Sequence, residues 1–131
     1  MKKDFKFWIF FSLAALETII LFWFSVLSSV GTIETGFMRL GDLEHFIAYA
    51  VYGFLLNQVA GYYMNRRRAL FVSVLIGSFV GGLSESIQHF IPYRTGDVLD
   101  WAADTIGSFA GALVSSGFKP FFINKLKPRG K

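Results

Sequence analysis

The residues best suited to chemistry in this chain lie close together, between positions 85 and 104. Seven polar or ionisable side chains fall in this stretch: Glu85, Gln88, His89, Arg94, Asp97, Asp100 and Asp104. Carboxylates and imidazole bind cations and exchange protons, whereas a guanidinium binds phosphates and carboxylates through paired hydrogen bonds. The stretch therefore has the side chains for ligand binding, for acid–base catalysis, or for a network that only holds helices together.

These polar residues interrupt a strongly apolar chain. The 131 residues are 53% hydrophobic, and the apolar ones gather in stretches long enough to cross a bilayer. The stretches are residues 7–30, 45–64, 69–89 and about 98–118. Ionisable groups at membrane depth are costly, and they are rare unless they pair, line a cavity or take part in function. The composition therefore indicates that residues 85–104 form the functional centre.

We predict an all-α membrane protein with four transmembrane helices in a compact antiparallel bundle, forming a single domain over residues 1–131. Eleven of the 13 basic residues precede the first span, separate the second from the third, or lie in the tail at 119–131. Basic loops stay in the cytoplasm, so we expect both termini there and a multi-pass location in the cytoplasmic membrane. The net charge of +4 follows this distribution and does not indicate nucleic-acid binding.

Three of the predicted spans carry polar side chains on one helical face at their outer ends. Residues three, four or seven positions apart lie on the same side of a helix. The members are His45, Tyr49 and Tyr52 in the second span, Glu85, Gln88 and His89 in the third, and Asp100 and Asp104 in the fourth. Because neighbouring helices pack about 8–10 Å apart, these side chains can meet in one polar pocket open to the outer surface.

Small residues predict where helices approach each other closely. The third span contains Gly77, Gly81 and Gly82, and the fourth contains Gly107 and Gly111. Glycine at such spacing lets the backbones of two membrane helices come together. The chain has no cysteine, which excludes disulfides, thiolate metal sites and cysteine nucleophiles.

Two segments, residues 40–56 and 85–111, resemble the VanZ-like family of small bacterial membrane proteins. The positions in register with the family's two motifs are His45, Phe46, Tyr49 and Gly53 in the first, and Glu85, Gln88, Phe90, Pro92, Arg94, Asp100, Asp104 and Gly107 in the second. The resemblance covers residues from about 38 to 115. It departs at Asp42, where the family carries a basic residue, and at Tyr52, where leucine is usual.

The resemblance implies a four-span protein of the cytoplasmic membrane with its polar cluster on the outer side. The family is named for a member linked to resistance against glycopeptide antibiotics of the teicoplanin type. Most of its members have no established biochemical activity. The resemblance therefore implies an effect on glycopeptide sensitivity and supplies no reaction.

We expect the polar pocket to bind an anionic lipid headgroup or a lipid-linked precursor of the cell envelope. Arg94 suits a phosphate or carboxylate, and the acids would orient it. The ligand-binding residues expected on this hypothesis are Arg94, Asp100, Asp104, Glu85, Gln88, His45 and Tyr49. We expect membrane lipids as partners, and neither a cofactor nor a resident metal.

An enzymatic interpretation uses the same residue types. His45 or His89 could act as a general base with a neighbouring carboxylate setting its tautomer. A histidine with Glu85, Asp100 and Asp104 could instead hold a divalent cation that activates a phosphate. Either arrangement suits phosphoryl or acyl transfer from a lipid, but no recognised catalytic signature is present.

A structural interpretation needs no ligand. Arg94 could simply neutralise Asp100 and Asp104, and such a network can fix the register of helices. The small-residue face at Gly107 and Gly111 could then dock a membrane-protein partner. On this interpretation the chain is an accessory subunit of a larger membrane complex.

Overall fold

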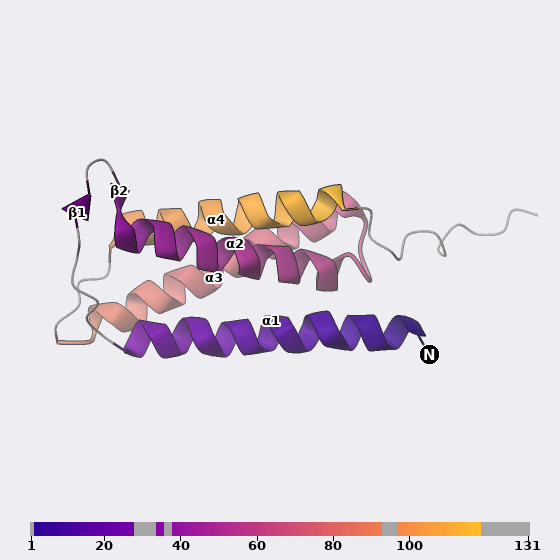
Figure 1. Ribbon diagram of the computed structural model, residues 1–131, viewed down its shortest axis with the longest axis horizontal. Helices are drawn as coiled ribbons and strands as arrows, with labels where there is room; N and C mark the ends of the chain where they lie inside the picture. The colour runs from indigo at the N-terminus through magenta and orange to yellow at the C-terminus, as the bar shows by residue number, and fades with distance from the viewer. Residues whose placement is uncertain (1, 28–33, 36–37, 93–96, 119–131) are drawn as a thin grey trace, which may run out of the picture.

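Four helices run back and forth along one axis in the computed structural model (Figure 1), which describes residues 2–27, 34–35, 38–92 and 97–118. They are α1 (Lys2–Val26), α2 (Leu40–Ala60), α3 (Arg66–His89) and α4 (Val98–Gly117). Two short strands between α1 and α2, β1 (Glu34–Thr35) and β2 (Met38–Arg39), form an antiparallel pair. The predicted all-α class is thus confirmed, with this small pair of strands added.

Helices α1, α2 and α3 each begin three to five residues before the predicted spans, and α3 begins within the predicted turn between α2 and α3. Residues 66–68 were predicted to form that turn, but they are the first turn of α3. Asn65 is the N-cap, and its side chain accepts a hydrogen bond from the backbone amide of Arg68. An amide side chain at this position satisfies a backbone donor that a helix start leaves free. The helix therefore begins directly after the cap, and the three arginines belong to it.

The start of α4 agrees with the sequence-based prediction. Asp97 is the N-cap, and its side chain accepts a hydrogen bond of 2.9 Å from the backbone amide of Leu99. At the other side of this connection, α3 ends at His89, shortly before Pro92. Proline disfavours helical geometry in the residue before it, which explains the position of this end.

Helices α2 and α4 pack most closely, and glycines make this possible. A β-carbon added to Gly107 would come within 2.5 Å of the backbone oxygen of Phe46, and one added to Gly111 within 1.7 Å of that of Ala50. The close approach expected of these two glycines is therefore made within the chain, by α2. Helix α2 thus occupies the face of α4 at Gly107 and Gly111 that was predicted to dock a membrane-protein partner.

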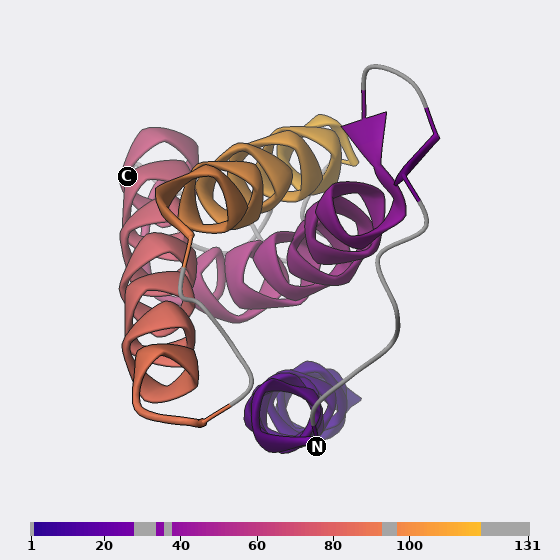
Figure 2. The ribbon, with the colours of Figure 1, turned by 90° about the vertical axis from the view of Figure 1, so that its left-hand side faces the viewer.

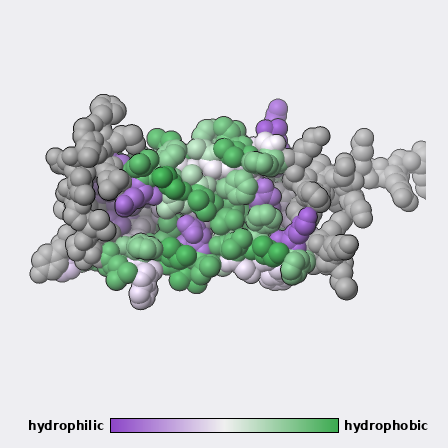
Figure 3. All heavy atoms as spheres, viewed as in Figure 1, coloured by the Kyte–Doolittle hydropathy of each residue, from purple (hydrophilic) through white to green (hydrophobic). Residues whose placement is uncertain are grey.

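The interior of the bundle contains polar side chains and its surface is largely apolar, the opposite of a water-soluble protein. The largest fully buried side chains are polar: Asp104, Ser73, Ser108 and Ser115. Large apolar side chains such as Phe71 and Phe79 stay exposed along the helices, and Figure 3 shows a mainly hydrophobic surface over the middle of the bundle. An apolar surface of this extent is a liability in water, whereas small and polar residues between helices are typical of membrane bundles.

Two of the described helices are long and apolar enough to cross a membrane, α1 over Phe5–Val26 and α3 over Arg66–His89. The prediction of four spans is thus supported for two helices only. The start of α1 and the end of α4 lie at the same end of the bundle (Figure 1). Figure 2 shows α2 between α1 and α4, with α3 crossing beside them. The side of the membrane on which each end lies stays a prediction.

Candidate functional site

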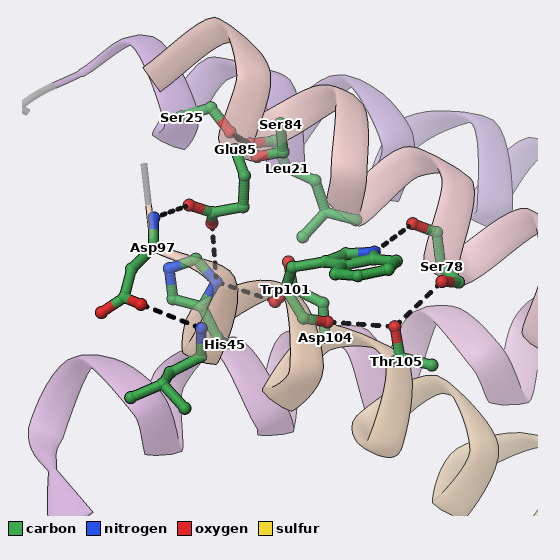
Figure 4. A network of polar contacts seen from close by, with 11 residues as sticks. Leu21, Ser25, His45, Ser78, Ser84, Glu85, Asp97, Trp101, Asp104 and Thr105 are labelled. Carbon is green, nitrogen blue, oxygen red and sulfur yellow. Dashed lines mark hydrogen bonds and ion pairs between the residues drawn. The ribbon is translucent and has the colours of Figure 1, made fainter. Parts of the chain in front are cut away.

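Three ionisable side chains from three helices meet at the end of the bundle where α2 begins and α3 ends (Figure 4). Nδ1 of His45 lies 2.8 Å from Oδ1 of Asp104 and 3.9 Å from Oε1 of Glu85. We refer to these three residues as the His45 cluster. All three belong to the set predicted from the sequence to bind a ligand.

The three residues meet because each lies within two turns of the helix end that reaches this end of the bundle. His45 lies in the second turn of α2 and Asp104 in the second turn of α4, and these helices run side by side in the same direction from this end. Glu85 lies about one turn before the end of α3. Gly81, one turn earlier, makes room for Asp104: an added β-carbon would come within 2.9 Å of the Asp104 carboxylate. The absence of a side chain at Gly81 thus permits the carboxylate to be buried.

Burial differs sharply within the cluster. Asp104 is 0% exposed and Glu85 is 8% exposed, whereas the side chain of His45 retains 24% of its accessible surface. Burying a carboxylate is costly unless it is paired and hydrogen-bonded. His45 is therefore the member that a molecule from outside can reach, and the two acids lie behind it.

The carboxylates are only partly satisfied. Oε2 of Glu85 accepts a hydrogen bond of 3.0 Å from the backbone amide of Asp97, which ties the end of α3 to the start of α4. Among the residues that the structure describes, Oε1 of Glu85 and Oδ2 of Asp104 are buried without a hydrogen-bond partner. Two carboxyl groups thus face one imidazole, and two of their buried oxygen atoms lack a hydrogen-bond donor among the described residues.

The contact between His45 and Asp104 orients the imidazole. An ionised carboxylate can only accept a hydrogen bond, so Nδ1 donates to Asp104 when Asp104 carries its charge. The tautomer and the ring orientation are then fixed, and Nε2 is the ring nitrogen left for a ligand. An imidazole held in this way can donate to an anion, serve as a base, or bind a metal.

The other predicted site residues lie around this cluster without joining it. Tyr49, one turn after His45, is buried in a small apolar core with Leu21 and Val80. Gln88 is buried on the same side of α3 as Glu85. Asp100 is half-buried near the side chain of Asp42.

Two further sequence-based predictions concern the connection between α3 and α4. Arg94, which we expected to bind the ligand, lies outside the described residues. His89, the alternative candidate for a general base, is exposed at the last position of α3. Between the two histidines of the chain, the structure therefore favours His45 as the functional one.

Several contacts that support the site were not predicted. The hydroxyls of Ser25 and Ser84 hydrogen-bond to each other, and this contact ties α1 to α3 beside Glu85 (Figure 4). The indole of Trp101 donates a hydrogen bond of 2.9 Å to the backbone oxygen of Ser78. The hydroxyl of Thr105 lies 3.0 Å from that of Ser78. Trp101 and Thr105 are four residues apart, so their helical spacing was a usable signal for a shared face.

A second group of polar contacts joins α2 to α4 nearer their other ends. The side-chain amides of Asn57 and Gln58 donate to Oγ of Ser115, at 3.1 Å and 2.9 Å. We refer to these three residues as the amide cluster. All of its members are neutral, and hydrogen bonds of this kind between helices are common in membrane bundles.

The comparison with protein families gives one result. The model of the VanZ/LLP1 family matches residues 2–119 of the chain, a range that includes all four helices and both clusters. No curated protein and no solved structure matches the chain. Because the family match extends over nearly the whole length, and the resemblance of the two motifs points the same way, the chain belongs to the VanZ/LLP1 family.

Proposed function

We propose that the chain crosses the cytoplasmic membrane four times and binds the anionic headgroup of a lipid, or of a lipid-linked envelope precursor, at the His45 cluster. One observation carries the proposal: three ionisable side chains converge at one end of a bundle whose remaining surface is mostly apolar. Such groups are expensive in a membrane protein and usually have a function. The link of the family's namesake to teicoplanin-type resistance extends the proposal to glycopeptide sensitivity.

The orientation follows from the distribution of basic residues. The three arginines at 66–68 begin α3 at the end of the bundle opposite to the His45 cluster. Lys6, in the second turn of α1, lies at that same opposite end. Basic residues favour the cytoplasmic side, so the cluster would face outward, where envelope precursors are used.

Within the proposed site, His45 makes the direct contact. Its ring is held by Asp104 through Nδ1, and Nε2–H would donate to a phosphate or carboxylate oxygen of the headgroup. Arg94 would add a second cation, because its forked guanidinium suits such anions. These two groups would contact the ligand's negative charge directly, whereas Glu85 and Asp104 lie behind His45.

The surroundings of the cluster suit an amphiphile. Val98 and Leu99 are exposed at the start of α4, directly after Asp97, whose backbone amide contacts Glu85. A headgroup bound at His45 would leave its hydrocarbon chains beside such apolar side chains, which stabilise them by excluding water. This arrangement favours a lipid-linked ligand over a free soluble anion.

Native mass spectrometry of gently extracted protein tests the proposal. The wild type should retain an anionic lipid or lipid-linked precursor, and both His45→Asn and Arg94→Ala should lose it. The matched control is His89→Asn, which changes the other, exposed histidine and should keep the ligand. Protein without a ligand in every sample would contradict the proposal, and a constant protein adduct would indicate an accessory subunit instead.

The His45–Asp104 contact also favours a second candidate, a lipid-phosphate hydrolase. In the neutral ring, Nε2 would take a proton from a water molecule that attacks the phosphorus atom. The bond between phosphorus and the lipid oxygen would break, Nε2 would return the proton to that oxygen, and the lipid alcohol and inorganic phosphate would separate. A histidine oriented by a carboxylate is suited to this task. The test is the release of phosphate from a short-chain lipid phosphate. Release that survives His45→Asn, or that is absent from the wild type, would rule out this role.

A further inference from the structure

The buried oxygen atoms of the His45 cluster point to a ligand of their own. Oδ2 of Asp104 and Oε1 of Glu85 have no hydrogen-bond partner in the described part of the chain, and both residues are more than nine-tenths buried. Buried polar atoms in folded proteins are nearly always satisfied, and each exception requires an explanation. An anionic headgroup does not provide one, because it would add negative charge to two carboxylates.

The spacing of the three side chains fits a single metal ion. One ligand atom from each of His45, Glu85 and Asp104 lies within 4.8 Å of the other two. Around a tetrahedral Zn²⁺, with bonds of about 2.0–2.1 Å, ligand atoms lie roughly 3.3 Å apart. The distances of 2.8 Å and 3.9 Å from Nδ1 of His45 to the two carboxylates bracket that value. Small rotations of the side chains would therefore bring all three onto one ion.

We propose that the His45 cluster binds one divalent transition-metal ion, Zn²⁺ foremost, through Nδ1 of His45 and one carboxylate oxygen each from Glu85 and Asp104. Two carboxylates and a neutral imidazole carry two negative charges, which a divalent ion cancels. An imidazole ligand favours zinc, copper, iron or nickel over calcium, magnesium and manganese, which prefer oxygen ligands. The metal displaces the proton that Nδ1 otherwise donates to Asp104: in a neutral ring this proton moves to Nε2, and an imidazolium releases it to water.

Neighbouring groups already hold the ligands in position. The backbone amide of Asp97 fixes the Oε2 atom of Glu85 and so directs Oε1 toward His45 (Figure 4). Gly81 leaves the space in which the Asp104 carboxylate lies. Outer contacts of this kind orient metal ligands and affect affinity strongly.

Three protein ligands leave the fourth position of a tetrahedral ion open. Because His45 is partly exposed, that position can face the outside, where a water molecule or a phosphate oxygen would occupy it. The bound ion would then supply the positive charge that an acidic site lacks for an anionic headgroup. The cation site nevertheless stands on the geometry of the cluster alone and does not require a lipid.

The test is metal binding to the full chain, without a histidine tag, in detergent free of anionic lipid. After treatment with a chelator, Zn²⁺, Mn²⁺ and Mg²⁺ are titrated by calorimetry, and retained metal is counted by mass spectrometry after desalting. The wild type should retain one equivalent of zinc. Glu85→Gln, Asp104→Asn and His45→Gln should each weaken zinc binding by about tenfold or more.

Matched controls and a folding measurement complete the experiment. His89→Gln and Glu44→Gln alter an exposed histidine and an exposed acid outside the cluster, and both should bind zinc as the wild type does. Zinc should raise the melting temperature of the wild type and of the two controls, but not that of Glu85→Gln, whose helical circular dichroism confirms folding. Absence of zinc binding in the wild type, or equal affinity in the three cluster variants, would overturn the proposal.

Discussion

The two polar clusters join the same pair of helices, and they differ in charge. Both connect α2 to α4, and both contain a buried oxygen without a hydrogen-bond partner among the described residues. In the amide cluster that atom is Oδ1 of Asn57, a neutral amide oxygen, whereas in the His45 cluster the atoms belong to carboxylates. An unsatisfied neutral group costs a few kcal/mol at most, but an unpaired buried charge costs far more.

We assign the amide cluster to the stability of the bundle and the His45 cluster to ligand binding. The amide cluster is neutral, and Ser115 accepts hydrogen bonds from both neighbouring amides, so no charge in it requires a counter-ion. The His45 cluster has two buried acids and one partly exposed imidazole, and we propose that a bound cation completes it. We therefore predict that changes in the amide cluster affect stability and that changes in the His45 cluster affect ligand binding.

The largest effect on stability is expected from a change that disrupts both clusters at once. In Gly111→Ala, the new methyl group would meet the backbone oxygen of Ala50 at 1.7 Å, so α2 and α4 must separate. Overpacking of this kind destabilises by about 3 kcal/mol, measured as a shift in denaturant unfolding in detergent. Gly117→Ala is the control, since no atom lies within 4 Å of its added carbon. Equal stability of the two variants would contradict the observed packing.

A change at Gly81 should affect the His45 cluster alone. The β-carbon of Gly81→Ala would come within 2.9 Å of Cβ and Oδ2 of Asp104, which displaces the carboxylate from His45. Losing a charged hydrogen bond of about 1.5–3 kcal/mol should lower headgroup retention by roughly tenfold or more. The neighbouring Gly82→Ala meets Trp101 at an ordinary 3.5 Å and should retain the ligand. Unchanged retention in both variants would place the binding site elsewhere.

The sequence predicted the members of the His45 cluster because each lies in a helix at a polar position within apolar surroundings. It did not predict the rotation of each helix about its axis, which the packing of all four helices determines. Tyr49 therefore faces the apolar core with Leu21, although it shares a helical face with His45 in the sequence. For the same reason the glycines of α4 face α2 rather than a partner.

A change in the amide cluster should affect stability and leave binding intact. Ser115→Ala removes the acceptor of two hydrogen bonds between α2 and α4. Since such bonds contribute about 0.6 kcal/mol each in membrane proteins, we expect a loss of about 1 kcal/mol in unfolding free energy. Ser116→Ala is the control, because that hydroxyl bonds only within α4, to the backbone oxygen of Leu113, in the part of the chain described. Loss of the bound headgroup in Ser115→Ala would contradict the assignment of the amide cluster to stability alone.

The smallest effect on stability is expected from a change at the contact between α1 and α2. The hydroxyls of Thr18 and Tyr52 hydrogen-bond at 2.9 Å, and Thr18→Val removes this contact while keeping the shape of the side chain. We expect a loss of about 0.6 kcal/mol in unfolding free energy and no change in headgroup or zinc binding. A change in binding would show that α1 takes part in the site.

The most direct test of the central claim compares the two clusters in one experiment. Native mass spectrometry is applied to the double variants His45→Asn with Asp104→Asn, and Asn57→Ala with Ser115→Ala, beside the wild type. Our account predicts that the first pair loses the bound lipid and that the second keeps it with a lower unfolding free energy. Retention of the same lipid by both double variants, or its loss from both, would contradict the assignment of the His45 cluster as the binding site.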